Sequence, residues 1–186
     1  MTIHRHLLLA ALITLLGIGG LGVGLMYWFH RGDLEVLVTT KWPEIGLQLA
    51  FGMGFAAISL VVLLGVLRRR FLEPTNHFFA SLIKKYQVTT PIIVLLSVCA
   101  GIGEELLFRG AIQPWLGIWL TAFVFILLHG YLDPRNRPLA VYGMILWVVS
   151  AGFGYLAQMW GLYAAMIAHT MIDIGLLMHL KKVAER

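Results

Sequence analysis

The sequence is poor in charged residues and in cysteine. Only 12% of its 186 residues are charged, whereas 60% are hydrophobic, and the mean hydropathy is +0.86. This composition is unusual for a soluble domain and typical of a polytopic membrane protein. The single cysteine, Cys99, excludes an internal disulfide and a cysteine-rich metal site. Because Cys99 lies in an apolar run, we expect it to be a small buried residue and assign it no role.

The excess of basic residues does not indicate nucleic-acid binding. Although the net charge is +5, the lysines and arginines lie in short connections between apolar runs, so we expect no nucleic-acid partner. Eleven of them fall on one side of the predicted spans, and only Arg31 and Lys41 fall on the other, with Arg109 inside a span. The positive-inside rule therefore predicts that both termini are cytoplasmic. The short connections suggest a prokaryotic cell membrane.

Six apolar runs are predicted to cross the membrane, since a spanning helix needs about 20 such residues. They are residues 7–29, 45–67, 91–116, 118–132, 139–160 and 162–180. Between the second and third runs, apolar residues from Phe78 to Tyr86 recur at helical spacing and predict a short interfacial helix. This helix either anchors on anionic lipid or packs on the bundle as a connector. The predicted fold is an all-α polytopic membrane helix bundle with about six transmembrane helices, forming a single domain over residues 1–186.

Several ionisable residues interrupt these apolar runs. A charged side chain at the centre of a membrane helix costs about 2.5 to 3.5 kcal/mol, so each such residue indicates a function. The residues are Glu104, Glu105, Arg109, His129, His169 and Asp173. They predict an active site within the membrane.

The spacing of these residues predicts how they pair. Glu105 and Arg109 are four residues apart, so on a helix they share a face and can neutralise one another. That pairing leaves Glu104 without a partner. His169 and Asp173 are also four apart, which lets the carboxyl group reach the imidazole.

A turn at Gly117 would bring two distant residues to similar depth. Glu104 lies 13 residues before Gly117 and His129 lies 12 residues after it. A hinge at Pro114 would instead separate the two depths by about 7 Å. Phe125 lies one turn before His129 and can stack on the imidazole or form a wall of the pocket.

These residues resemble three motifs of the CPBP family of intramembrane proteases, which takes in CAAX prenyl endopeptidases and bacteriocin-processing or immunity (Abi) proteins. The similar elements are Glu-Glu-x-x-x-Arg at Glu104, Glu105 and Arg109, Phe-x-x-x-His at Phe125 and His129, and His-x-x-x-Asn at His169 and Asp173. They place the motif-bearing core in residues 91–180. The departure is Asp173, because an asparagine amide donates a hydrogen bond and an ionised carboxylate does not. Two roles therefore stay open for Asp173: a protonated hydrogen-bond donor, or an ionised group that orients His169.

The resemblance implies an intramembrane endopeptidase. It would hydrolyse a peptide bond near the C-terminal tail or the leader of a membrane-associated protein or peptide. The implied roles are water activation by Glu104 and His129, polarisation of the scissile carbonyl by His169 and Asp173, and bracing of the site by Glu105, Arg109 and Phe125. Membrane lipids and the membrane-associated substrate are the expected partners.

Other chemistries fit the same residues. Glu104, His129 and His169 would make a zinc site with two histidines, one carboxylate and an open position for water. Because the sequence has no His-Glu-x-x-His element, we favour a glutamate-activated water and expect no cofactor. From other functional classes, a small proton-coupled transporter would use such groups as a proton path. A non-catalytic membrane immunity or partner protein would not need their reactivity.

Overall fold

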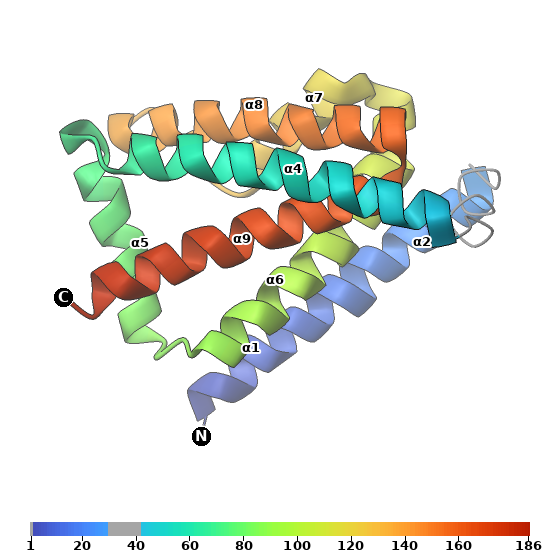
Figure 1. Cartoon of the computed structure of the whole chain (residues 1–186). Coiled ribbons are helices and arrows are strands. Elements are labelled where there is room, and N and C mark those ends of the chain that lie inside the picture. The colour runs from blue at the N-terminus through green and yellow to red at the C-terminus, as the bar shows by residue number, and fades with distance from the viewer. Residues whose placement is uncertain (1, 30–41) are drawn as a thin grey trace.

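The computed structural model describes residues 2–29 and 42–186, and within these ranges the chain forms helices and short connections but no β-strand (Figure 1). The elements are α1 (Thr2–Leu12), η1 (Ile13–Ile18), α2 (Gly19–Phe29), α4 (Trp42–Leu67), η2 (Arg70–Leu72), α5 (Glu73–Lys85), α6 (Thr90–Glu105), η3 (Leu106–Ile112), α7 (Gln113–Leu128), α8 (Arg137–Trp160) and α9 (Leu162–Ala184). The predicted all-α, polytopic class is confirmed. Arg31 and Lys41, expected on the side opposite the termini, lie outside the described residues.

The starts of the central helices follow from local sequence. Pro91, Pro114 and Pro138 each occupy the second position of a helix, in α6, α7 and α8 respectively. The first turn of a helix does not use its N–H groups in internal hydrogen bonds, so proline costs nothing there. The side chain of Asn136 also accepts a hydrogen bond from the backbone N–H of Leu139 at 3.3 Å and so caps α8.

Five helical runs, rather than the predicted six, are long and apolar enough to cross a membrane in the described part of the chain. The predicted spans 91–116 and 118–132 fall in one run, Thr90–Leu128, whose helical geometry breaks at Gly117 (φ 70°, ψ 172°). After Gly117 only residues 118–128 are helical, which is about 17 Å at 1.5 Å per residue and too short for a bilayer core of about 30 Å. The chain therefore turns at Gly117, as expected, but returns as a short helix.

Helix α9 lies at the centre of the bundle, where it packs against α4, α5, α6 and α8. Its contact with α4 is close because Ala164, Ala165 and Ala168 are small and fully buried. Figure 1 shows α4, α8 and α9 running along one another, with both chain termini at the same end of the bundle. The basic residues also predict both termini on one side, and the side of the membrane that they face stays a prediction.

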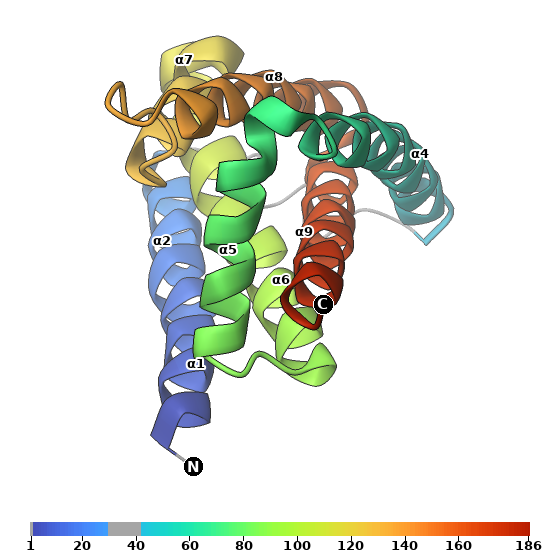
Figure 2. The same cartoon turned by 90° about the vertical axis from the view of Figure 1, so that its left-hand side faces the viewer.

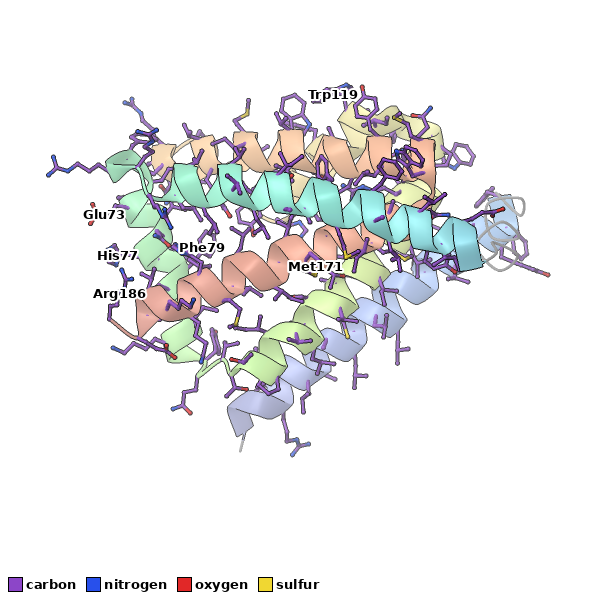
Figure 3. The ribbon with its side chains drawn as sticks, in the orientation of Figure 1. Glu73, His77, Phe79, Trp119, Met171 and Arg186 are labelled. Atoms are coloured by element: carbon purple, nitrogen blue, oxygen red, sulfur yellow. The ribbon has the colours of Figure 1, made fainter. Side chains whose placement is uncertain are left out.

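Helix α5 corresponds to the predicted interfacial helix. Figure 2 looks onto the end of the bundle where α5 lies across it, beside the C-terminal part of α9. Figure 3 shows Glu73 and His77 on the outer side of α5 and Phe79 on the side that faces the bundle. Phe79 packs edge-on against Tyr131 at 5.9 Å between ring centroids. This packing makes α5 a connector, while anchoring on anionic lipid stays a prediction.

Candidate active site

Glu104 and Glu105 end helix α6, and a close helix crossing brings them to α9. A Cβ atom at Gly101, one turn earlier, would collide with Thr170 Oγ1 on α9. Glycine therefore permits the two backbones to approach more closely than other residues would allow. The crossing places both carboxylates beside the imidazole of His169.

Glu105 is fully buried, with 0% of its surface exposed, and it accepts hydrogen bonds from two side chains. Arg109 Nη1 donates to Glu105 Oε1 at 3.1 Å, and His169 Nδ1 lies 2.7 Å from the same oxygen. The other end of Arg109 donates from Nη2 to the Ser150 carbonyl at 2.9 Å and to the Ser150 hydroxyl at 2.7 Å. Buried charges need such extra bonds to offset their desolvation. The predicted contact of Glu105 with Arg109 is confirmed.

The hydrogen bonds of the two imidazoles define which nitrogen faces the site. His129 is the C-terminal cap of α7, whereas the sequence predicted it inside a helix. Its Nδ1 lies 2.7 Å from the Phe125 carbonyl. A carbonyl only accepts, so His129 Nδ1 carries the hydrogen. His169 Nδ1 likewise lies 2.7 Å from Glu105 Oε1, which also accepts from Arg109, so His169 Nδ1 donates to Glu105. Both imidazoles therefore present Nε2 to the site.

Glu104 lies between these two nitrogens. Its Oε2 atom is 3.8 Å from His129 Nε2 and 3.8 Å from His169 Nε2, and Asp173 Oδ2 is 3.5 Å from His169 Nε2. These separations are longer than the usual length of a direct hydrogen bond but shorter than the combined length of two. One water molecule can therefore bridge each pair of side chains. The structure thus brings together Glu104, His129, His169 and Asp173 from three separate parts of the chain.

A cavity of about 150 Å³ opens onto these groups. It is large enough for a few water molecules, each of which takes about 30 Å³ in the liquid. The side chains of His129 and Asp173 are 33% and 32% exposed, whereas that of Glu104 is 13% exposed. The site is therefore shielded at Glu104 and more open at His129 and Asp173.

Aromatic rings wall the cavity and hold the imidazoles. Phe125 lies 4.3 Å from the His129 ring, centroid to centroid, which confirms its predicted place in the wall. Tyr131 stacks on His129 at 5.8 Å, and Phe153 stacks on His169 at 5.2 Å. The Arg109 guanidinium lies over Phe125 at 5.0 Å and over Phe153 at 5.4 Å, positions where the ring face attracts a cation.

Sequence reasoning missed several residues of this site. They are Ser150, Phe153, Tyr131 and Tyr142. Ser150 carried a weak signal, since it is the only serine or threonine in the apolar run of α8. The other three are aromatic residues in an aromatic-rich chain, and nothing in their spacing distinguishes them from lipid-facing residues.

The zinc alternative has a geometric requirement. Zinc holds its ligands at about 2.0 to 2.2 Å, which sets donor atoms of a tetrahedral site about 3.3 Å apart. The distances of 3.8 Å from Glu104 Oε2 to the two histidines are longer than this. Within residues 2–29 and 42–186, no group of three or more His, Cys, Asp or Glu side chains is arranged to hold a metal ion as it stands.

A second cavity, of about 760 Å³, has Arg109 in its lining. Among the described residues, its lining includes Gln48, Gln113, Trp119 and Tyr155 but no histidine, aspartate or glutamate. The smaller cavity, which is lined by Glu104 and both histidines, is therefore the better candidate for catalysis despite its size.

The part of the chain that contains the candidate active site is similar in sequence to known proteins. Residues 86–175 match the family model described as type II CAAX prenyl endopeptidase Rce1-like, and this segment contains every predicted site residue. An uncharacterized protein of Bacillus subtilis (strain 168), YpbD, is 31% identical over 86 residues, which cover 45% of this chain and 42% of YpbD. The chain thus matches less than half the length of that relative. No solved structure matches.

Proposed function

We propose that this chain is an intramembrane endopeptidase that cleaves by means of a glutamate-activated water. Its residues 86–175 match the family model of the Rce1-like type II CAAX prenyl endopeptidases. The observation that carries the proposal is the position of Glu104 Oε2, 3.8 Å from the Nε2 atoms of both histidines. A carboxylate and two imidazoles around a water-sized space can supply the general base and the hydrogen-bond donors that amide hydrolysis uses.

In the proposed reaction, a water held between Glu104 and His129 is the nucleophile. Glu104 removes a proton from this water as its oxygen forms a bond to the scissile carbonyl carbon. His129 supports that step, because its Nδ1 is committed to the Phe125 carbonyl and its Nε2 therefore faces the water. As the carbon–nitrogen bond breaks, protonated Glu104 returns the proton to the leaving amine. The products are a carboxylic acid and an amine.

His169 polarises the scissile carbonyl in this proposal. Glu105 Oε1 holds His169 Nδ1 at 2.7 Å, which fixes the ring and directs Nε2 toward the cavity. With a proton on each nitrogen, His169 donates from Nε2 to the carbonyl oxygen. Asp173 Oδ2 lies 3.5 Å from the same Nε2 and helps to orient the ring. Glu105 and Arg109 brace the site and do not touch the substrate.

The size of the site limits how a substrate binds. The cavity of about 150 Å³ holds water but not a folded segment, so only the scissile bond and its neighbours reach Glu104. We assign the substrate to the C-terminal tail or leader of a membrane-associated protein or peptide, which would enter from the more exposed side of His129 and Asp173. Membrane lipids surround the remainder of the bundle.

The chain is an integral membrane protein, as the five long apolar helices among its described residues indicate. We assign it to a prokaryotic cell membrane with both termini in the cytoplasm. The support is the grouping of eleven lysines and arginines on the side of the termini, which lie at one end of the bundle in Figure 1.

The test is the variant Glu104→Gln, which keeps the shape of the side chain and removes its basicity. Protein termini in membranes with wild type and with Glu104→Gln are compared by mass spectrometry. A shortened product should appear with wild type and be absent with Glu104→Gln. Glu73→Gln is the matched control, because the side chain of Glu73 is 64% exposed at the bundle surface and should process normally. Full processing by Glu104→Gln contradicts the proposal.

The same experiment separates the alternatives. A transporter would lose pH-driven flux with Glu104→Gln without altering the length of any protein, and a non-catalytic partner would tolerate the change. Measuring cleavage in the presence of a metal chelator tests the zinc alternative. We expect cleavage to persist in the chelator. If cleavage is lost and added zinc restores it, a metal-dependent mechanism replaces the activated-water mechanism.

A further inference from the structure

Two tyrosines line the cavity of the candidate active site without an assigned role. Tyr131 lies in the connection after α7, and its ring is parallel to that of His129 at 5.8 Å and 9°. Tyr142 lies in the second turn of α8 and meets Tyr131 edge-on at 6.0 Å and 86°. Phe79 of α5 also contacts Tyr131 edge-on at 5.9 Å. Packing on these sides positions the Tyr131 ring beside the catalytic groups.

The Tyr131 hydroxyl group is available as a hydrogen-bond donor. Both Tyr131 and Tyr142 line the cavity, and no hydrogen bond of either hydroxyl group to another described residue is seen. Burial, followed by the nearby carboxylates of Asp173 and Glu104, raises the pKa of Tyr131 above its ordinary value, so the phenol keeps its proton. A neutral phenol in a shielded cavity can donate a strong hydrogen bond to a developing negative charge.

The site needs such a donor because Asp173 does not supply one when ionised. Hydrolysis places negative charge on the former carbonyl oxygen, and donors aimed at that oxygen stabilise the transition state. An ionised Asp173 beside the cavity would repel the oxyanion. His169 is then the one donor assigned so far, and Tyr131 lines the same cavity, against His129.

We propose that Tyr131 is a further catalytic residue, whose hydroxyl donates a hydrogen bond to the oxyanion of the tetrahedral intermediate. This role rests on the proposed endopeptidase function. When the water oxygen bonds to the carbonyl carbon, the carbonyl π electrons move to oxygen, and Tyr131 holds that oxygen without transferring its proton. When the carbon–nitrogen bond breaks, the carbonyl re-forms, Glu104 protonates the leaving amine, and Tyr131 is unchanged.

The experiment compares Tyr131→Phe with wild type in proteoliposomes. The probe is a fluorescence-quenched peptide with a farnesylated cysteine followed by three residues, the substrate type in the description of the matching family. Tyr131→Phe keeps the ring that stacks on His129 and removes only the hydroxyl. We expect kcat to fall by about 100-fold, as for loss of one oxyanion donor, while KM stays within about twofold. The Tm should not change.

Tyr86→Phe is the matched control, since it loses the same hydroxyl from a residue outside the cavity. Tyr86 caps the C-terminus of α5, is 40% exposed and does not line the cavity. We expect Tyr86→Phe to keep kcat within about threefold of wild type. An equal loss in both variants would overturn the specific role of Tyr131.

A rescue by Asp173→Asn distinguishes donation from packing. In the Tyr131→Phe background, an asparagine amide at position 173 supplies a new donor to the cavity, and we expect it to recover kcat by about tenfold or more. No recovery would overturn the proposal, because a lost donor should be replaceable.

The outcomes for Glu104 and Tyr131 are separable. If Glu104→Gln cleaves the probe at the wild-type rate, the proposed function itself fails. If Glu104→Gln is inactive and Tyr131→Phe retains full kcat, the endopeptidase function stands and the role of Tyr131 is refuted.

Discussion

Replacing Glu105 by methionine should destabilise the folded protein more than almost any other single change. Glu105 is 0% exposed, and its removal leaves the Arg109 cation buried without a counter-ion at that end, with hydrogen bonds to the oxygens of Ser150 alone. At 3.1 Å and an effective dielectric constant of about 20, the lost attraction is about 5 kcal/mol. Measured losses from breaking a buried pair are about 3 to 5 kcal/mol, so we expect Glu105→Met to cost about 4 kcal/mol.

The reverse change should cost less. Arg109→Met leaves the Glu105 carboxylate with the hydrogen bond from His169 Nδ1 at 2.7 Å, so we expect a loss of about 2 to 3 kcal/mol. The double variant Glu105→Met/Arg109→Met removes both charges and fills their space with apolar side chains of similar length. Such replacements are often neutral, and we expect it to lie within about 2 kcal/mol of wild type.

The assay is reversible unfolding in mixed micelles, from which the free energy of unfolding of wild type, both single variants and the double variant gives a double-mutant cycle. From these losses, the expected coupling is about 4 to 7 kcal/mol. Cleavage should remain lost in the stable double variant, since His169 Nδ1 has no acceptor and its ring is no longer held. Additive losses in the cycle, with no coupling between Glu105 and Arg109, would refute the reasoning.

Two further predictions concern the fold. Gly101→Ala should destabilise the protein by about 1 to 3 kcal/mol, because the new Cβ collides with Thr170 where α6 crosses α9, whereas Gly54→Ala, with nothing within 4 Å, should be neutral or slightly stabilising. Both are measured by the same unfolding assay, and equal effects would contradict the close crossing. Reporter enzymes that fold only outside the cytoplasm should be inactive when fused to either terminus, and activity at one terminus alone would contradict the predicted topology.

Local sequence patterns were sufficient for the helices and for the pairs within one helix. Glu105 and Arg109 could be paired from their four-residue spacing, because neighbours on a helix surface are set by its geometry alone. The turn at Gly117 was also predictable, since glycine readily takes the positive φ observed there. The same patterns did not reveal that residues after Gly117 remain helical only to Leu128, which is why six spans were predicted instead of five.

Contacts between helices were predicted less well. The hydrogen bond from His169 to Glu105 and those from Arg109 to Ser150 join residues 64 and 41 positions apart. Such contacts depend on how closely two helices cross and how each is rotated about its axis. Small residues such as Gly101 control that approach, and their effect becomes visible only when the partner helix is known.

The sequence by itself determined that the chain forms membrane-spanning helices and which ionisable residues lie among them. The physical reason is that hydrocarbon cannot hydrogen-bond the backbone, so long apolar runs must become helices, and a charge within them is costly enough to be informative. Only the tertiary structure decided that Glu104 lies between two imidazoles and that Tyr131 faces the same cavity. Those positions follow from side-chain packing between helices, which no periodicity within one helix encodes.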